Sequence, residues 1–186
     1  MKKIPTLFQR DPSDLSRLLD EIHPDCAWVV DGEGIATQKV DGTSCLFEDG
    51  AWWKRREIKK GKVPPPDFRE ASHDAATGKR TGWVPVTDED RWHREAIARL
   101  VDSAVASGSY ELLGPKIQGN PEGFAEHTLV EHATLKSYPD APTDRAALAS
   151  WLSEQAMEGL VWHHPDGRMA KIKRRDFGLP WPIKGR

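Results

Sequence analysis

Four Asp-Gly dipeptides separate short segments of this chain in which apolar and polar residues alternate. Asp-Gly is a preferred two-residue turn of antiparallel hairpins, because both residues tolerate the positive φ angles of that turn. Three of the dipeptides lie close together after Pro24, at Asp31-Gly32, Asp41-Gly42 and Asp49-Gly50. The fourth lies near the C-terminus, in Pro165-Asp166-Gly167. The pattern predicts strands at Cys26–Val30, Ile35–Val40, Thr43–Glu48, Ala51–Glu57, Gly159–His163 and Met169–Lys173. Antiparallel sheets are therefore expected toward both ends of the chain.

Apolar residues at helical spacing predict helices before and between these strands. The three predicted helices run from Ser13 to Ile22, from Thr87 to Gly108 and from Thr143 through Leu152. Further strands are predicted at Tyr110–Leu113 and Thr128–Glu131, with a Gly/Pro/Asn-rich loop at Gly114–Gly123 before the second. Together these elements predict an α+β fold of antiparallel β-sheets flanked by helices.

The stretch from Lys59 to Val86 shows no sustained period. Pro64-Pro65-Pro66 and several glycines interrupt it. Long connections of this kind are usually functional or mobile. We therefore expect this stretch to be a surface lid or flap.

The composition is that of a globular protein of about one domain's length. The chain has 186 residues, 38% hydrophobic and 30% charged, with a mean hydropathy of -0.64. Its longest apolar run, Cys26–Val30, is far shorter than the roughly 20 residues of a membrane-spanning helix. Cys26 and Cys45 lack the spacing of a zinc site, so reduced thiols are expected. We expect a single domain over residues 1–186 and a cytoplasmic location.

Positive charge is concentrated in two segments, although the formal net charge is -2. Between Lys54 and Lys62, six basic residues accompany one acidic residue, Glu57. A second basic run begins at Arg168 and includes Lys184 and Arg186. Such segments attract phosphate groups, and the alternative is that each is an ordinary solvated surface.

A candidate nucleophile occurs in Lys39-Val40-Asp41-Gly42-Thr43, where a predicted strand meets a turn. The end of a strand is a position that presents a side chain to a cleft. Burial beside other cations lowers the pKa of a lysine and so favours its neutral, nucleophilic form. The alternative is a surface lysine beside a turn, because Lys-x-Asp-Gly alone is a short motif.

Three further charged elements follow this lysine on predicted strands. They are Tyr110-Glu111-Leu112, Glu158-Gly159-Leu160-Val161 and Lys171-Ile172-Lys173. In order and approximate spacing, the chain resembles the covalent nucleotidyltransferase superfamily of ATP-dependent ligases and capping enzymes. The Lys54-Arg55 strand end and the ending Lys173-Arg174-Arg175 make residues 26 to 177 most similar to the ATP-dependent RNA ligases.

The resemblance implies a nucleotidyltransferase (ATP-grasp-like ligase) catalytic domain and a three-step reaction. A lysine takes AMP from ATP, the AMP passes to a 5′-phosphate of RNA, and a 3′-hydroxyl displaces it to leave a phosphodiester. Mg²⁺ is the expected metal ion, with Mn²⁺ as an alternative, and RNA repair is the expected role. Two other functions stay open: a DNA ligase-like core, and a non-catalytic nucleotide- or RNA-binding module of the same fold.

The resemblance also implies roles for the residues that match the family's motifs. Lys39 is the expected nucleophile, and Lys171 and Lys173 are expected to neutralise the α-phosphate. Glu111 is expected to accept a hydrogen bond from ribose, and Glu158 to orient a hydrated metal ion.

Other residues complete the expected nucleotide site. Arg55 is expected to contact the AMP phosphate or the RNA 5′ end, with Arg56 as the alternative. Val161 is expected to pack on adenine and Gln38 to read the base edge. His132 is a candidate for the opposing stacking group.

The chain departs from the well-known relatives after Phe177, where about nine residues follow. Those relatives append an OB-fold or a helical module there, so we expect a minimal core without an appended OB-fold. RNA would then be held by the core's own surface, or by a separate RNA-binding partner. The candidate RNA contacts are Arg56, Lys59, Lys60, Arg174 and Arg175.

Overall fold

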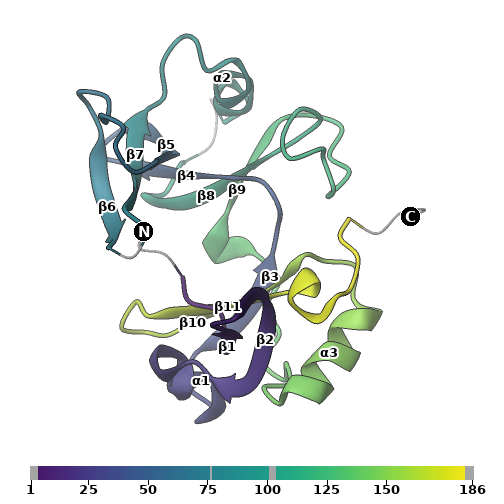
Figure 1. The fold of residues 1–186 in the computed structure, drawn as a ribbon. Coiled ribbons are helices and arrows are strands. Elements are labelled where there is room, and N and C mark those ends of the chain that lie inside the picture. The colour runs from purple at the N-terminus through teal and green to yellow at the C-terminus, as the bar shows by residue number, and fades with distance from the viewer. Residues whose placement is uncertain (1–3, 76, 101–103, 183–186) are drawn as a thin grey trace. The chain divides into compact units, whose positions relative to one another are not determined.

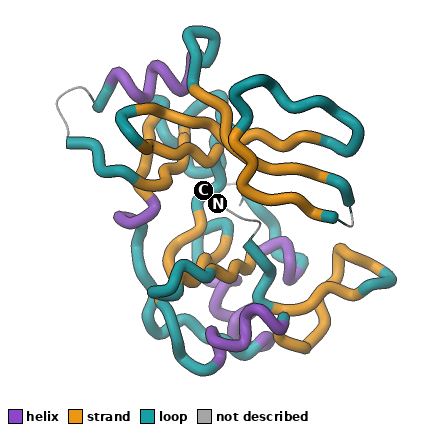
Figure 2. Tube along the Cα trace, turned by 90° about the vertical axis from the view of Figure 1, so that its left-hand side faces the viewer, coloured by secondary structure: helices purple, strands orange, loops and turns teal. Residues whose placement is uncertain are grey.

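A computed structural model describes residues 4–75, 77–100 and 104–182 of the chain (Figures 1 and 2). Their contacts divide the chain into two compact units. We name residues 41–134 the central unit, and residues 4–40 with 135–182 the split unit. Strands, orange in Figure 2, outnumber helices in each. No helix of the described residues is long and apolar enough to cross a membrane.

The split unit is built on a three-stranded antiparallel sheet in the order β11-β10-β3. β3 spans Ile35–Lys39, β10 spans Gly159–His163 and β11 spans Met169–Lys173. Leu160 and Ile172 lie opposite each other on one face of this sheet and are fully buried. Helix α3, Arg145–Glu154, adds Leu148 and Leu152 to the same core, because residues four apart share one helix face.

A hairpin and short helical segments complete the split unit. They are β1 (Phe8–Asp11), β2 (Asp14–Ile22), η1 (Pro24–Cys26), α1 (Ala27–Val30) and η3 (Arg174–Phe177). The segment before β1 runs beside β11: the Leu7 amide donates to the Lys171 carbonyl at 2.8 Å, and the Lys171 amide donates to the Pro5 carbonyl at 3.0 Å. This segment therefore covers the outer edge of β11.

The central unit contains a six-stranded antiparallel sheet in the order β6-β7-β5-β4-β8-β9. Its elements are β4 (Thr43–Glu48), β5 (Ala51–Ile58), β6 (Arg69–Asp74), β7 (Lys79–Pro85), α2 (Arg91–Ala98), β8 (Gly108–Leu113), β9 (Thr128–Glu131) and η2 (His132–Thr134). On one face, Ala96 of α2 packs with Cys45 and Leu112. Because side chains alternate along a strand, Ser44 and Glu111 lie on the opposite face.

The predicted α+β class with antiparallel sheets is confirmed. β4, β9, β10 and β11 have the predicted bounds, and β10 and β11 form the predicted hairpin. The prediction that Asp41-Gly42 closes a hairpin is wrong, because β3 pairs with β10 whereas β4 pairs with β5 and β8. This dipeptide instead lies where the chain passes from the split unit into the central unit.

The predicted helix from Ser13 to Ile22 is wrong, because residues 14–22 form strand β2. β2 pairs with β1, with Phe8 opposite Ile22 and Arg10 opposite Leu18. The leucines of this segment have the spacing of an apolar helix face. Leu15, however, is 68% exposed, so these leucines are not buried together as such a face would require. Pairing with a neighbouring strand outweighs local propensity here.

The predicted strand at Cys26–Val30 is also wrong, because Ala27–Val30 is helix α1. A short apolar run fits a buried helical turn as well as a strand. Pro24 begins the preceding η1 with its φ already suited to a helix, and His23 Nδ1 accepts a hydrogen bond from the Asp25 amide at 3.2 Å.

The stretch from Lys59 to Val86 is not an irregular lid or flap, because β6 and β7 form an antiparallel pair within it. A Cβ on Gly82 would lie 2.1 Å from the Arg69 carbonyl oxygen, so the glycine permits a close approach of strands. Gly78, with φ +66, occupies the turn. These glycines therefore belong to a hairpin that extends the sheet.

Two helix boundaries differ from prediction. α2 spans Arg91–Ala98 rather than the stretch from Thr87 to Gly108, of which residues 101–103 lie outside the described residues. Thr87 and Asp90 form a separate turn, in which the Asp90 carboxylate accepts from the Thr87 amide at 2.8 Å. α3 is capped by Asp144, whose side chain accepts from the Ala147 amide, rather than by Thr143.

Candidate active site

Three strands of the split unit bring two of the predicted catalytic lysines into one row. Gly159 on β10 is in register with Lys39 of β3 on one side and with Lys173 of β11 on the other. A Cβ built on Gly159 would lie 2.0 Å from the Ile172 carbonyl oxygen. The glycine is therefore required by the close approach of β11.

The carboxylate of Glu158 joins these two lysines. Lys39 Nζ donates to Oε2 and Lys173 Nζ donates to Oε1, while Arg175 Nη2 lies 3.4 Å from Oε1. The Glu158 side chain is only 1% exposed. Burial alone would raise the pKa of Glu158, but the charges of Lys39 and Lys173 outweigh it and keep that pKa below its usual value. A charged carboxylate thus fixes the position of the predicted nucleophile.

Lys171 lies two residues before Lys173, on the same face of β11. Burial, and then the positive charges of Lys173 and Lys39, lower its pKa to about 8. The Lys173 pKa is also lowered by burial and by Lys39, although Glu158 opposes this shift. Three amines therefore crowd one face of the sheet around a single carboxylate, an arrangement that favours an added anion.

The same register separates Val161 from Gln38. Val161 is paired with both Thr37 and Lys171, so it shares the face that carries the lysines. Gln38 is paired with Leu160 and lies on the opposite face, because neighbouring residues of a strand alternate. The register thus favours the predicted role of Val161 and does not favour a base contact by Gln38.

In the central unit, two carboxylates hold the backbone of the Asp41-Gly42 dipeptide. The Gly42 amide donates to Glu111 Oε1 at 3.2 Å, and the Asp41 amide donates to Glu122 Oε1 at 3.1 Å. A Cβ on Gly42 would lie 2.3 Å from the Leu112 carbonyl oxygen, so only glycine fits beside β8. The second and third residues after the predicted nucleophile are therefore anchored by side chains from distant parts of the sequence.

Glu111 is largely buried, and its second oxygen is also bonded. His132 Nε2 lies 3.1 Å from Glu111 Oε2, and His132 Nδ1 lies 2.9 Å from Ser109 Oγ. These bonds place both His132 and Glu111 in a polar chain on one face of the sheet. In this structure Glu111 anchors the Gly42 turn, and its predicted contact with ribose stays a prediction.

Arg55 and Arg56 point to opposite faces of β5. Arg55 lines a pocket of the central unit, and its guanidinium lies 5.8 Å from the centre of the Trp83 ring. Burial lowers the pKa of Arg55, whereas Glu111 and Glu57 oppose that shift. Arg56 is exposed and does not line this pocket, which makes Arg55 the better candidate for a phosphate contact.

The predicted RNA contacts differ in exposure. Lys59, Lys60 and Arg175 are exposed. Arg174 is 4% exposed, and it donates to the carbonyl oxygens of Leu152, of Gln155 at 2.6 Å and of Pro180 at 3.1 Å. Arg174 therefore stabilises the packing of η3 on α3, and this position does not fit an RNA contact. Lys184 and Arg186 of the same basic run lie outside the described residues.

Sequence reasoning did not identify Glu122 or the contact of Arg175 with Glu158. Glu122 lies in an irregular loop, 81 residues from Asp41, and no local pattern marks it. Among the described residues, no group of three or more His, Cys, Asp or Glu side chains is arranged to hold a metal ion. A metal ion at Glu158 would need ligands from water and substrate, which is the usual binding mode of Mg²⁺.

Comparison with known protein families shows to which family this chain belongs. Residues 93–186 match the family model described as RNA ligase 1. This chain belongs to the RNA ligase 1 family. The match includes Glu111, Glu158, Lys171 and Lys173, whereas Lys39 precedes it.

Three relatives named RNA ligase 1 are similar over most of the chain. Identity is 28% over 222 residues with the protein of Danio rerio, covering 80% of this chain and 68% of the relative. It is 28% over 223 residues with that of Rattus norvegicus and 25% over 223 residues with that of Pongo abelii, each covering 80% of this chain and 69% of the relative. The similarity to RNA ligase 1 thus extends well beyond residues 93–186.

Proposed function

We propose that this RNA ligase 1 family member is an ATP-dependent RNA ligase that joins a 5′-phosphate to a 3′-hydroxyl. The observation that carries the proposal is the shared carboxylate of Glu158, which holds both Lys39 and Lys173 at one row of the sheet. A nucleophilic amine beside other amines is suited to attack on a phosphate, because their positive charges attract the phosphate. RNA repair is the proposed role.

In the first step, the neutral amine of Lys39 attacks the α-phosphorus of ATP. A P–N bond forms, the bond between the α-phosphorus and the bridging oxygen breaks, and pyrophosphate leaves as Lys39 loses a proton. Lys173 and Lys171 stabilise the charge that develops on the α-phosphate oxygens. Lysyl-AMP is the product.

The second and third steps use RNA ends. An oxygen of the RNA 5′-phosphate attacks the lysyl-AMP phosphorus, the P–N bond breaks, and Lys39 regains a proton. The RNA 3′-hydroxyl then attacks the 5′-phosphate phosphorus, loses its proton, and displaces AMP. A phosphodiester bond and free AMP result.

Glu158 is the candidate residue for a divalent ion, which we propose to be Mg²⁺, with Mn²⁺ as an alternative. Both Glu158 oxygens accept from lysines in this structure, so such an ion would complete its coordination with water and substrate oxygens. Such an ion neutralises triphosphate charge. Glu158 itself orients the Lys39 amine, and Arg55, Glu111 and Val161 are proposed as further nucleotide contacts.

RNA is proposed to bind through exposed basic residues, in part with help from a separate RNA-binding partner. Arg56, Lys59, Lys60 and Arg175 are exposed and suited to phosphate contacts. Arg174 is left out of this set because its guanidinium binds backbone carbonyls.

The test is to incubate the purified protein with ATP and Mg²⁺ and to measure its intact mass. We expect one covalent AMP in the wild type and none in Lys39→Ala. Lys136→Ala, a lysine of the same unit outside the row, serves as the control and keeps the adduct. Nicked RNA and nicked DNA with 5′-phosphates then show which polymer is sealed. An adduct on Lys39→Ala, or none on wild type freed of bound AMP by pyrophosphate, would contradict the proposal.

A further inference from the structure

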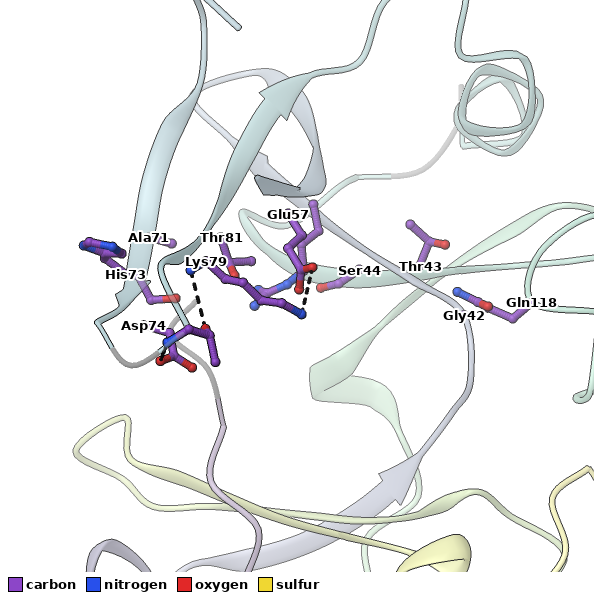
Figure 3. Close-up of a pocket in the computed structure, with 13 residues that line it drawn as sticks. Gly42, Thr43, Ser44, Glu57, Ala71, His73, Asp74, Lys79, Thr81 and Gln118 are labelled. Carbon is purple, nitrogen blue, oxygen red and sulfur yellow. Dashed lines mark hydrogen bonds and ion pairs between the residues drawn. The ribbon is translucent and has the colours of Figure 1, made fainter. Parts of the chain in front are cut away.

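The central unit contains a pocket of about 780 Å³ (Figure 3). It lies on the sheet face that carries Ser44 and Arg55, with residues of α2 packed on the other face. It extends from Gly42 to the turn between β6 and β7, where Asp74 and Lys79 line it. All of its lining residues belong to the central unit.

The strand register explains why charged side chains meet on this face. Glu57 of β5 is in register with Thr81 of β7, and Thr81 with Ser72 of β6. Lys79 is two residues from Thr81, so it lies diagonally across from Glu57. Its Nζ is 3.2 Å from Glu57 Oε1, and both side chains remain half exposed.

The lining of the pocket is polar. Hydroxyl groups come from Thr43, Ser44, Ser72, Thr77 and Thr81. Ala71 is the one apolar side chain in the described lining, and His73 is the one aromatic ring. Sites for nucleobases are mostly apolar and aromatic, whereas sugar hydroxyls and phosphates need hydrogen-bond donors, acceptors and cations. This lining therefore suits a ribose-phosphate chain rather than a base.

Two cations and two carboxylates are arranged within the pocket. Arg55 lies near the Gly42 end, and Lys79 lies at the end formed by the β6–β7 turn. Glu57 and Asp74 accept hydrogen bonds but repel phosphate, so they suit ribose hydroxyls between phosphates. Ser44 also lines the pocket, and its buried Oγ has no hydrogen-bond partner among the described residues.

We propose that this pocket binds the ribose-phosphate backbone of the RNA substrate, with Lys79 as a phosphate contact. The inference rests on the proposed function, because it places the substrate of the second and third steps. Lys79 leaves Glu57 for an RNA phosphate, since the ion pair is half exposed and therefore weak. The adjacent hydroxyls bind the sugars.

The test measures binding of a 3′-labelled, 5′-phosphorylated RNA by fluorescence anisotropy at several salt concentrations. We expect Lys79→Ala to weaken binding about fivefold and to lower the salt slope by about 0.7, the value for one contact to single-stranded RNA. Thr81→Val removes a lining hydroxyl and is expected to weaken binding about twofold. Arg91→Ala, which removes an exposed charge from α2, is the matched control and keeps wild-type affinity.

A second readout separates RNA binding from the nucleotide step. Formation of the AMP adduct with ATP alone is expected to be unchanged in Lys79→Ala. An affinity equal to that of Arg91→Ala would overturn the inference, and an equal loss of adduct formation would assign the pocket to ATP and also overturn it. Failure of the proposed function is seen separately, as a wild-type protein that forms no adduct.

Discussion

Lys39 forms a hydrogen-bonded ion pair with Glu158, a residue 119 positions further along the chain. The carboxylate also holds Lys173, so one buried negative charge is shared by two amines. This arrangement holds the predicted nucleophile in place. Attack requires a neutral amine, so the proposed nucleotide or metal ion would have to change the charges around Glu158 first.

Glu158→Gln removes this charge and leaves the two amines beside a neutral amide. We expect the protein to lose about 1–3 kcal/mol of unfolding free energy in urea titrations. We also expect the rate of AMP adduct formation to fall at least about tenfold, because Lys39 loses its orienting partner. The Lys173 pKa should fall further, since Glu158 raises it.

Glu154→Gln provides the matched control for that change. Glu154 is exposed at the end of α3, and the same chemical substitution there removes a solvated charge. Its stability is expected to change by less than about 0.5 kcal/mol. Equal effects of the two substitutions would show that Glu158 has no special role in holding the lysines.

Lys171 is expected to titrate near pH 8, because burial and the charges of Lys173 and Lys39 disfavour its ammonium form. NMR of ¹³C-methylated lysines measures this pKa directly. Lys173→Met removes a neighbouring charge and is expected to raise the Lys171 pKa toward 10.5. A Lys171 pKa near 10.5 in the wild type would contradict the crowded arrangement of amines.

The same shift gives stability a direction with pH. The folded protein releases the Lys171 proton near pH 8, whereas the unfolded chain keeps it to about pH 10.5. Between these values the unfolded state binds more protons, so the contribution of Lys171 to stability rises with pH. Below pH 8 the destabilising effect of Lys171 is fully present, and it is lost as the pH rises through this window. Urea titrations of the wild type and Lys171→Met across this window check the sign by difference.

The hairpin of β10 and β11, which sequence predicts with correct bounds and pairing, is decided by local chemistry. β10 and β11 alternate regularly about Pro165-Asp166-Gly167, so both the strands and their pairing follow from neighbouring residues. The leucines of β2 fit a helix, and only its pairing with β1 makes this segment a strand. The sequence does not predict the β6–β7 hairpin, because a glycine such as Gly82 at a close approach of strands looks the same in sequence as a glycine that interrupts a strand.

In the candidate site too, motif spacing predicts some residues, whereas others depend on contacts between distant parts of the chain. Motif spacing selected Lys39, Glu158 and Lys173, which the split unit does bring together. Spacing did not reveal that Arg174 is a structural residue, because its carbonyl partners on Leu152 and Gln155 come from a helix that precedes the motif. Nor did it identify Glu122, whose contact with Asp41 depends on the path of a loop.

Arg174 and Arg175 are neighbours with different expected roles. Arg174→Met leaves the carbonyls of Leu152, Gln155 and Pro180 without their charged donor, and we expect a loss of about 3 kcal/mol in unfolding free energy. Arg175→Met removes a side chain that is 65% exposed, so its stability is expected to stay within about 0.5 kcal/mol. Urea unfolding followed by tryptophan fluorescence compares the two. The proposed RNA contact further predicts weaker RNA binding for Arg175→Met at unchanged stability.

Gly159 is expected to tolerate no side chain. In Gly159→Ala the new methyl group meets the Ile172 carbonyl oxygen at 2.0 Å, so β11 must move away from β10. We expect a loss of about 1–3 kcal/mol in unfolding free energy, and slower adduct formation because the spacing of Lys39 and Lys173 across β10 changes. Gly108→Ala is the control, since its nearest neighbour would be 3.9 Å away and its stability should change by less than about 0.5 kcal/mol. A Gly159→Ala protein as stable and as active as Gly108→Ala would show that β11 does not approach β10 as closely as this register requires.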